Sequence, residues 1–379
     1  MSVFYVPSVN LIGCGVINEI GGHIKELGYK KALLVTDHYI ASSDILPKVT
    51  APLDKEGIEY VVFSDVEPNP TVKNVEDGLA VLRDNNCDFI ISLGGGSPQD
   101  AASSISILAT NGGRPQDYEG VHKSKEKGLP VVAINTTAGT SAEITINYVI
   151  TDAEKNRKMV CVDPHDIPVV AFIDPDMMSS MPKGLTAATG MDALTHAIEG
   201  YITAGAWELS DMFHLKAIEI ISRSLRGAVD NTPEGREGMA LGQYVAGMGF
   251  SNVGLGIVHS MAHPLGALYD TPHGIANAII LPTVMEYNAE ATGDKYKYIA
   301  QAMGVEGTES MTQEEYRKAA VDAVKKLAKD VGIPENLKDI VKKEDIPFLA
   351  QSAYDDACRP GNPKETSVAD ITELYESLI

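Results

Sequence analysis

The chain has 379 residues, of which 44% are hydrophobic and 22% charged, a composition typical of a soluble globular protein with more than one domain. Its formal net charge of −21 argues against nucleic-acid binding, which needs a basic face, and no run of about 18 apolar residues predicts a membrane span. The four cysteines are widely spaced, so we expect neither a disulfide scaffold nor a zinc ribbon, and a reducing cytoplasm fits this pattern.

The first half of the chain alternates strand and helix signals. Continuous apolar runs rich in β-branched residues predict strands that are buried on both faces, at 31–36, 60–63, 88–93, 131–134 and 169–173. Helical stretches lie between several of them, for example at 74–83 and 99–109. This alternation predicts a Rossmann-like α/β domain over residues 1–182.

After about residue 182 the strand signals stop. The remaining periodic segments predict helices at 185–202, 210–229, 235–250, 274–287, 312–331 and 368–378. We therefore expect an all-α domain over residues 183–379.

A glycine-rich turn follows the predicted strand at 88–93. Three glycines at 94–96 allow backbone to approach a phosphate closely, and a helix N-terminus there would attract a pyrophosphate. Ser97 is expected to cap this helix, Pro98 to take its first position, and Asp100 to stand where a capping-box acid would. An ordinary turn between strand and helix is the alternative.

Two further polar positions follow predicted strands. Asp37 stands where a carboxylate can accept the hydroxyls of an adenosine ribose and repel a 2′-phosphate, which favours NAD over NADP. A helix cap is the alternative reading of Asp37. The loop at 135–143 offers the hydroxyls of Thr136 and Thr137 for diphosphate or nicotinamide contacts, although by itself it is only a polar turn.

Five potential metal ligands cluster in the second half. Asp192 and His196 are four residues apart on a predicted helix, which places both on one face with their Cβ atoms about 5–6 Å apart. His259 and His263 repeat this spacing, and His273 follows a short turn. Imidazoles with one carboxylate suit a divalent metal such as iron or zinc. Histidines that simply fill the core are the alternative, but burying so many polar groups unpaired would cost several kcal/mol.

Five groups are too many for a four-ligand site with an open position, so one histidine should remain for proton transfer. Spacing alone does not say which one. Pro264 disfavours helical geometry at His263 and is expected to bend or end the helix there. His263 is therefore the histidine most easily directed away from the metal and left for proton transfer.

Four motifs together resemble the iron-activated (group III) alcohol dehydrogenase family, over essentially the whole chain: GGGSPQD, TTAGTSAE, ATGMDALTHAIEGY and GIVHSMAHPLGALYDTPHG. The resemblance implies the architecture shared with dehydroquinate synthase, a homo-oligomer, and NAD with Fe²⁺ or Zn²⁺ as cofactors. It also implies reversible oxidation of a short alcohol or diol to its aldehyde. Stretches such as TINYVITDAEKNRKMVCVDPHDIP most resemble members that act on lactaldehyde and 1,2-propanediol; 1,3-propanediol and simple primary alcohols are the competing substrates.

The resemblance also implies roles for individual residues. It assigns the metal to Asp192, His196, His259 and His273, and it leaves His263 beside the nicotinamide as the proton carrier. The positions that match NAD contacts are Asp37, Asn69, Gly95, Gly96, Ser97, Thr136, Thr137 and Lys158. The positions that match the substrate pocket are Asn147, Val149, Phe250 and Cys358.

One departure from the family pattern concerns the cofactor. The family motif usually continues from the aspartate as D-x-x-K, but here Asp100 is followed by Ala-Ala-Ser103, which removes a positive charge near the glycine-rich turn. Two other functions are the alternatives. A dehydroquinate-synthase-like lyase would need basic residues to bind a polyanionic substrate, and region 250–273 contains few of them. A metal- or nucleotide-binding regulatory module would show no turnover.

Overall fold

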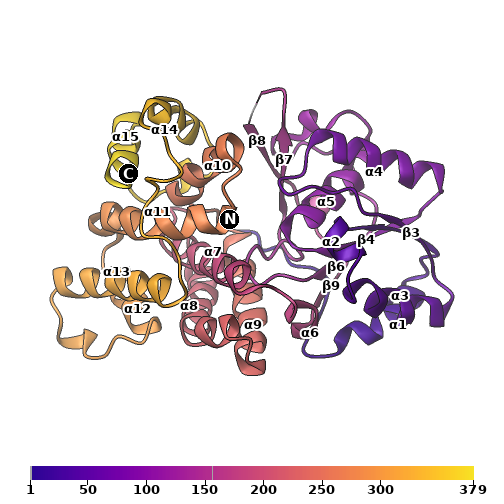
Figure 1. Cartoon of the computed structure of the whole chain (residues 1–379), viewed down its shortest axis with the longest axis horizontal. Coiled ribbons are helices and arrows are strands. Elements are labelled where there is room, and N and C mark those ends of the chain that lie inside the picture. The colour runs from indigo at the N-terminus through magenta and orange to yellow at the C-terminus, as the bar shows by residue number, and fades with distance from the viewer. Residues whose placement is uncertain (1, 156) are drawn as a thin grey trace. The chain divides into compact units, whose positions relative to one another are not determined.

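The computed structural model describes residues 2–155 and 157–379 and divides them into two compact units (Figure 1). The first unit comprises the residues up to Thr137 together with Ser141–Ser180, and the second comprises Ala138–Thr140 with Met181–Ile379. The expected boundary after residue 182 lies close to this division. None of the described helices combines the length and hydrophobicity that a membrane span requires.

The first unit contains a parallel sheet with the strand order β1-β9-β6-β4-β2-β3. Its strands are β1 (Val9–Ile12), β2 (Lys31–Val35), β3 (Glu59–Phe63), β4 (Phe89–Gly94), β6 (Val131–Asn135) and β9 (Val170–Ile173). Its helices are α1 (Ile20–Leu27), α2 (His38–Ala41), α3 (Ile45–Glu56), α4 (Val72–Asp84), α5 (Gly96–Asn111) and α6 (Pro175–Met178).

Successive residues of the central strands enter opposite cores. Leu33 of β2 packs in a cluster with Ile105 of α5, whereas its neighbour Leu34 packs in a second cluster with Leu53 of α3. A strand with both faces covered has no polar side, which explains the continuous apolar runs in the sequence. The predicted Rossmann-like α/β domain is thereby confirmed.

A second, smaller sheet was not predicted. It consists of β5 (Gly120–Val121), β7 (Asn147–Asp152) and β8 (Arg157–Val162), with β7 and β8 antiparallel. Buried and partly exposed residues alternate along β7 and β8, and the buried Tyr148 and Met159 pack into the cluster that also contains Ile105. A half-buried strand shows a period of two instead of a continuous apolar run.

The second unit is helical throughout its described secondary structure, as expected. Its α-helices are α7 (Lys183–Ile202), α8 (Glu208–Val229), α9 (Pro233–Phe250), α10 (Ile257–Tyr269), α11 (His273–Asn288), α12 (Lys295–Ala302), α13 (Gln313–Asp330), α14 (Ile346–Tyr354) and α15 (Val368–Ser377). Helix α7 is buried on nearly every side from Thr186 onward and packs against α8, α9 and α11. This helix carries Asp192, His196 and Glu199, which are discussed below.

The helix does not end at His263, so the prediction of a helix end there was wrong. Helix α10 continues through Pro264 to Tyr269. An interior proline costs a helix about 3 kcal/mol. Residues 257–266 are all buried, so tertiary packing offsets that cost.

Candidate metal and cofactor sites

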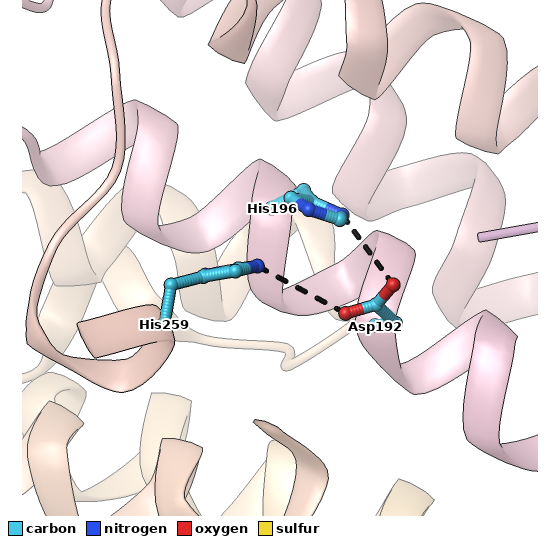
Figure 2. Close-up of side chains that lie close together, drawn as sticks. All are labelled: Asp192, His196 and His259. Atoms are coloured by element: carbon cyan, nitrogen blue, oxygen red, sulfur yellow. Dashed lines mark ion pairs between the residues drawn. The ribbon is translucent and has the colours of Figure 1, made fainter. Parts of the chain in front are cut away.

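Helix α7 presents two potential ligands on one buried face. Asp192 and His196 are 2% and 5% exposed, and Nδ1 of His196 lies 3.9 Å from Oδ2 of Asp192. His259, near the start of α10, places Nε2 3.9 Å from Oδ1 of the same carboxylate. Figure 2 shows both imidazoles directed toward Asp192. One potential ligand atom from each residue lies within 4.8 Å of the other two.

His273, the first residue of α11, joins this group. Its Nε2 lies 3.7 Å from Oδ1 of Asp192, and its ring centroid lies 5.3 Å from that of His259. The fold therefore brings the three histidines that the resemblance assigns to the metal close to the carboxylate of Asp192, the fourth residue of that set.

The donor set and its spacing fit a divalent metal. Ligand atoms around a tetrahedral ion with bonds of about 2.1 Å are about 3.4 Å apart, close to the spacing found here. Among the described residues, the buried Nδ1 of His196 has no hydrogen-bond partner. Burial lowers the pKa of both His196 and His259 to about 4, so these imidazoles are neutral at pH 7, the form that binds metal.

Glu199 contacts His259 at Nδ1, the ring nitrogen that faces away from Asp192, and was not predicted from the sequence. Its Oε2 lies 2.6 Å from Nδ1 of His259, and its Oε1 accepts the backbone N–H of Val258 at 2.7 Å. Burial raises the pKa of Glu199 to about 7. When Glu199 is ionised, Nδ1 of His259 donates to it and Nε2 keeps its lone pair toward Asp192. The available signal was spacing, since Glu199 follows His196 by three residues on the same face of α7.

Asn277 was also missed. It is fully buried on α11, four residues after His273, and its Nδ2 donates to Oδ1 of Asp192 at 2.6 Å. A single asparagine in an apolar helix gives no signal of this role, because the contact depends on how α11 packs against α7.

His263 is directed to a different carboxylate. Its Nδ1 lies 2.8 Å from Oδ2 of Asp356, and its ring stacks on that of His273 with centroids 5.5 Å apart. Burial acts to raise the pKa of Asp356, but the adjacent His263 outweighs it and the pKa is below its ordinary value. An imidazole with one nitrogen held by a carboxylate is suited to proton transfer at the other.

The residues predicted to line the substrate pocket belong to both units. Phe250, at the end of α9, stacks on His196 with ring centroids 4.2 Å apart. Cys358 donates its backbone N–H to Oδ1 of Asp356 at 2.8 Å, and burial raises the pKa of its thiol well above the ordinary value. Asn147 and Val149 lie on β7 of the first unit.

The predicted cofactor residues of the first unit gather at the carboxyl ends of three neighbouring strands. Asp37 follows β2, Gly95 follows β4 and Thr136 follows β6, and these strands are adjacent in the sheet. A Cβ on Gly95 would lie 2.8 Å from Cγ2 of Thr137, so glycine permits the two turns to approach. The strand order changes direction between β2 and β4, which is where doubly wound sheets bind nucleotides.

The helix after this turn starts earlier than expected. Gly95 is its N-cap and Gly96 its first residue, so Ser97 does not cap it, and no side chain caps it. Its first-turn amides are thus left to backbone or ligand partners. Asp100 is not a capping-box acid either: it is half-buried, it accepts the backbone N–H of Val149, and burial raises its pKa to about 8.

The other residues predicted to contact NAD differ in their structural surroundings. Asp37 does cap a helix, since its Oδ1 accepts the backbone N–H of Ile40 at 2.8 Å. Asn69 adopts a left-handed conformation (φ 58°) in the segment between β3 and α4. Lys158 on β8 acts electrostatically on Asp100. It therefore supplies a positive charge near α5, where the buried Ser103 replaces the usual lysine.

Comparisons with known proteins agree over the full chain. Residues 7–175 match the family model of the iron-containing alcohol dehydrogenases, and residues 186–379 match that of the C-terminal part of the Fe-containing alcohol dehydrogenase family. Lactaldehyde reductase from Escherichia coli (strain K12) is 56% identical over 368 residues, covering 96% of each chain. The NAD-dependent methanol dehydrogenase of Bacillus methanolicus is 39% identical over 382 residues, covering 100% of each chain.

A solved structure gives the same picture. The crystal structure of a 1,3-propanediol oxidoreductase superposes with a TM-score of 0.97 at 42% identity, covering 100% of each chain. The sequence models, the relatives and the shared architecture all point to one group of enzymes. The chain therefore belongs to the iron-containing alcohol dehydrogenase family.

Proposed function

We propose that this enzyme interconverts lactaldehyde and 1,2-propanediol with NAD and a divalent metal, preferably Fe²⁺. The observation that carries the proposal is the convergence of His196, His259 and His273 on the carboxylate of Asp192. The substrate follows from the similarity to lactaldehyde reductase, and the cofactor from that to an NAD-dependent methanol dehydrogenase.

The cofactors supply the chemistry that side chains lack: a bound divalent cation provides Lewis acidity toward the substrate oxygen, and NAD accepts or donates the hydride. The chain's own residues prepare the site. Neutral imidazoles at His196 and His259 keep their lone pairs for coordination, and Glu199 fixes the tautomer and orientation of His259.

Proton transfer is assigned to His263. Asp356 holds its Nδ1 at 2.8 Å, so Nε2 is the atom that accepts or returns the alcohol proton. Cys358 fixes the other oxygen of Asp356 through its backbone N–H, which keeps the carboxylate aligned with the imidazole.

The NAD site is proposed at the edge formed by β2, β4 and β6. The first-turn amides of α5 are suited to a diphosphate, and we assign Gly95, Gly96 and Ser97 to its binding. We assign Oδ2 of Asp37 to a ribose hydroxyl, since Oδ1 caps α2. Thr136 and Thr137, with Asn69 and Lys158, complete the proposed set.

We also propose a cytoplasmic homo-oligomer. Strand β1 is an edge of the large sheet, and its Val9 and Ile12 are 39% and 43% exposed. An open edge with exposed apolar side chains is suited to pairing with another copy of the chain. The cysteines form no disulfide in the described residues, in keeping with a reducing compartment.

The test is NAD-coupled activity across C2–C4 alcohols and diols, with Fe²⁺ or Zn²⁺ restored to chelated protein. The expected result is the highest kcat/KM for 1,2-propanediol and lactaldehyde, with more activity restored by Fe²⁺. A preference for 1,3-propanediol or a simple primary alcohol would replace the substrate while keeping the reaction. No change in NADH absorbance with any of these compounds would contradict the proposed function altogether.

A further inference from the structure

A single amide group lies among the proposed ligand atoms. Nδ2 of Asn277 is 2.6 Å from Oδ1 of Asp192, 3.0 Å from Nε2 of His273 and 3.2 Å from Nε2 of His259. Asn277 has no exposed surface, and one helical turn separates it from His273, so both side chains extend from the same face of α11.

The amide nitrogen and a cation need the same lone pairs. An amide NH₂ group carries two N–H donors and offers no lone pair for a metal. Oδ1 of Asp192 accepts as a carboxylate oxygen, and Nε2 of each histidine accepts in the tautomer that carries its proton on Nδ1. Each N–H bond to these atoms therefore occupies an electron pair that a metal would use.

The amide oxygen of Asn277 is not stabilised by this arrangement. Oδ1 of Asn277 is buried and has no hydrogen-bond partner among the described residues. Leaving a buried carbonyl unpaired is unfavourable, and the contacts of Nδ2 with Asp192 and the two imidazoles compensate for it. The orientation of the amide is thus fixed by the ligand atoms themselves.

We propose that Asn277 is an internal competitor of the metal: its amide bonds to ligand atoms of Asp192, His259 and His273 in the metal-free protein and withdraws when the cation enters. The proposal rests on the metal site described above. It implies that the metal-free site is kept assembled by hydrogen bonds. It also implies that the metal binds less tightly than the same ligands would allow without the amide, since binding must break those bonds.

Two alanine substitutions on α11 separate this role from a general loss of packing. Asn277→Ala removes the competing donors. Asn288→Ala is the matched control, because Asn288 is also buried on α11 but donates to Oδ1 of Asn362 at 2.8 Å. The Zn²⁺ dissociation constant is measured by competition with a chromophoric chelator, and the unfolding midpoint is measured with and without Zn²⁺.

For Asn277→Ala we expect Zn²⁺ to bind about tenfold more tightly, equivalent to about 1.4 kcal/mol. The midpoint should fall more for the metal-free protein than for the Zn²⁺-loaded protein, because the lost hydrogen bonds exist only without metal. For Asn288→Ala both midpoints should fall together, with the dissociation constant unchanged.

Weaker or unchanged Zn²⁺ binding by Asn277→Ala would overturn the competition. If Asn277→Ala does not fold, Asn277→Ser provides the same comparison, since its hydroxyl is too short to bridge the three atoms. A wild-type protein that takes up no Zn²⁺ would instead overturn the metal site itself, so the two failures are distinguishable.

Discussion

The imidazole of His259 is held between two carboxylates, one at each nitrogen. Glu199 lies 2.6 Å from its Nδ1, and Asp192 lies 3.9 Å from its Nε2. The short contact is a hydrogen bond, whereas the long one leaves room for an ion. The contact between Glu199 and His259 therefore leaves Nε2 as the nitrogen that faces Asp192 and the proposed metal.

Replacing Glu199 should weaken metal binding. Glu199→Gln keeps the size of the side chain but removes the charge that holds the proton on Nδ1 of His259. We expect a 10- to 100-fold rise in the metal dissociation constant, the usual effect of losing such a partner. Chelator competition measures it, and Glu219→Gln, an exposed acid on α8, is the control. An unchanged dissociation constant would show that Glu199 has no part in the site.

Replacing His263 should affect turnover and not metal content. His263→Ala removes the proposed proton carrier, so kcat should fall at least about 100-fold while bound metal per subunit is nearly unchanged. Steady-state kinetics and metal analysis of the same sample provide the two measurements. If His263→Ala instead empties the metal site, the division of roles among the histidines is wrong. Asp356→Asn should lower kcat by a smaller factor, also without loss of metal.

The stability of the protein should depend on pH through His214. Its ring is fully buried on α8 against Gly200 and Gly249, and neither ring nitrogen has a hydrogen-bond partner in the described part of the chain. Burial lowers its pKa to about 3, so the folded protein keeps it neutral where the unfolded chain binds a proton. The stabilisation is present above about pH 6.5 and is lost as the pH falls toward 3, by at most about 1.4 kcal/mol per pH unit.

His214→Gln tests this dependence. The free energy of unfolding of the metal-free protein is measured by denaturant titration between pH 4 and pH 7. The variant should show a shallower loss of stability toward acid than the wild type. His122→Asn, an exposed position, should leave the slope unchanged. Equal slopes for His214→Gln and the wild type would mean that His214 takes up a proton in the folded state.

The charge of Asp37 should determine the choice between NAD and NADP. Asp37→Asn preserves the helix cap, because asparagine caps as well as aspartate, but it removes the repulsion of a 2′-phosphate. The ratio of kcat/KM for NAD to that for NADP should fall about tenfold, while the unfolding midpoint should not change. A constant ratio would leave Asp37 with the capping role alone.

The large sheet and the cluster of ligand candidates were accessible from the sequence because both leave a local pattern. Strands with two covered faces give continuous apolar runs, and Asp192 with His196 shows helical spacing directly. Residues that act through one tertiary contact have no such pattern. Asn277 is such a residue, a single buried asparagine in a mostly apolar helix. Glu199 does show helical spacing with His196, but its role, like that of Asn277, depends on how α7 packs with α10 and α11.

Predictions from local sequence preferences were wrong where tertiary packing outweighed those preferences. Pro264 should end a helix, but the surroundings of α10 are buried and the helix continues. Ser97 is a good capping residue, but the chain turns two residues earlier, at Gly94 and Gly95, so the helix has already begun. The β7–β8 hairpin, which was not predicted, differs from the large sheet in burial: its residues alternate between buried and partly exposed, whereas β4 and β6 are buried throughout.

The positions of Asp192, His259 and His273 on three different helices have a further consequence. A cation held by these residues would act as a reversible cross-link between α7, α10 and α11, closing the chain segment between Asp192 and His259, which are 67 positions apart. Hydrogen exchange of the backbone amides in all three helices should therefore slow together when the metal is added. The metal content of a preparation would then report how tightly this part of the protein is assembled, independently of whether it turns over substrate.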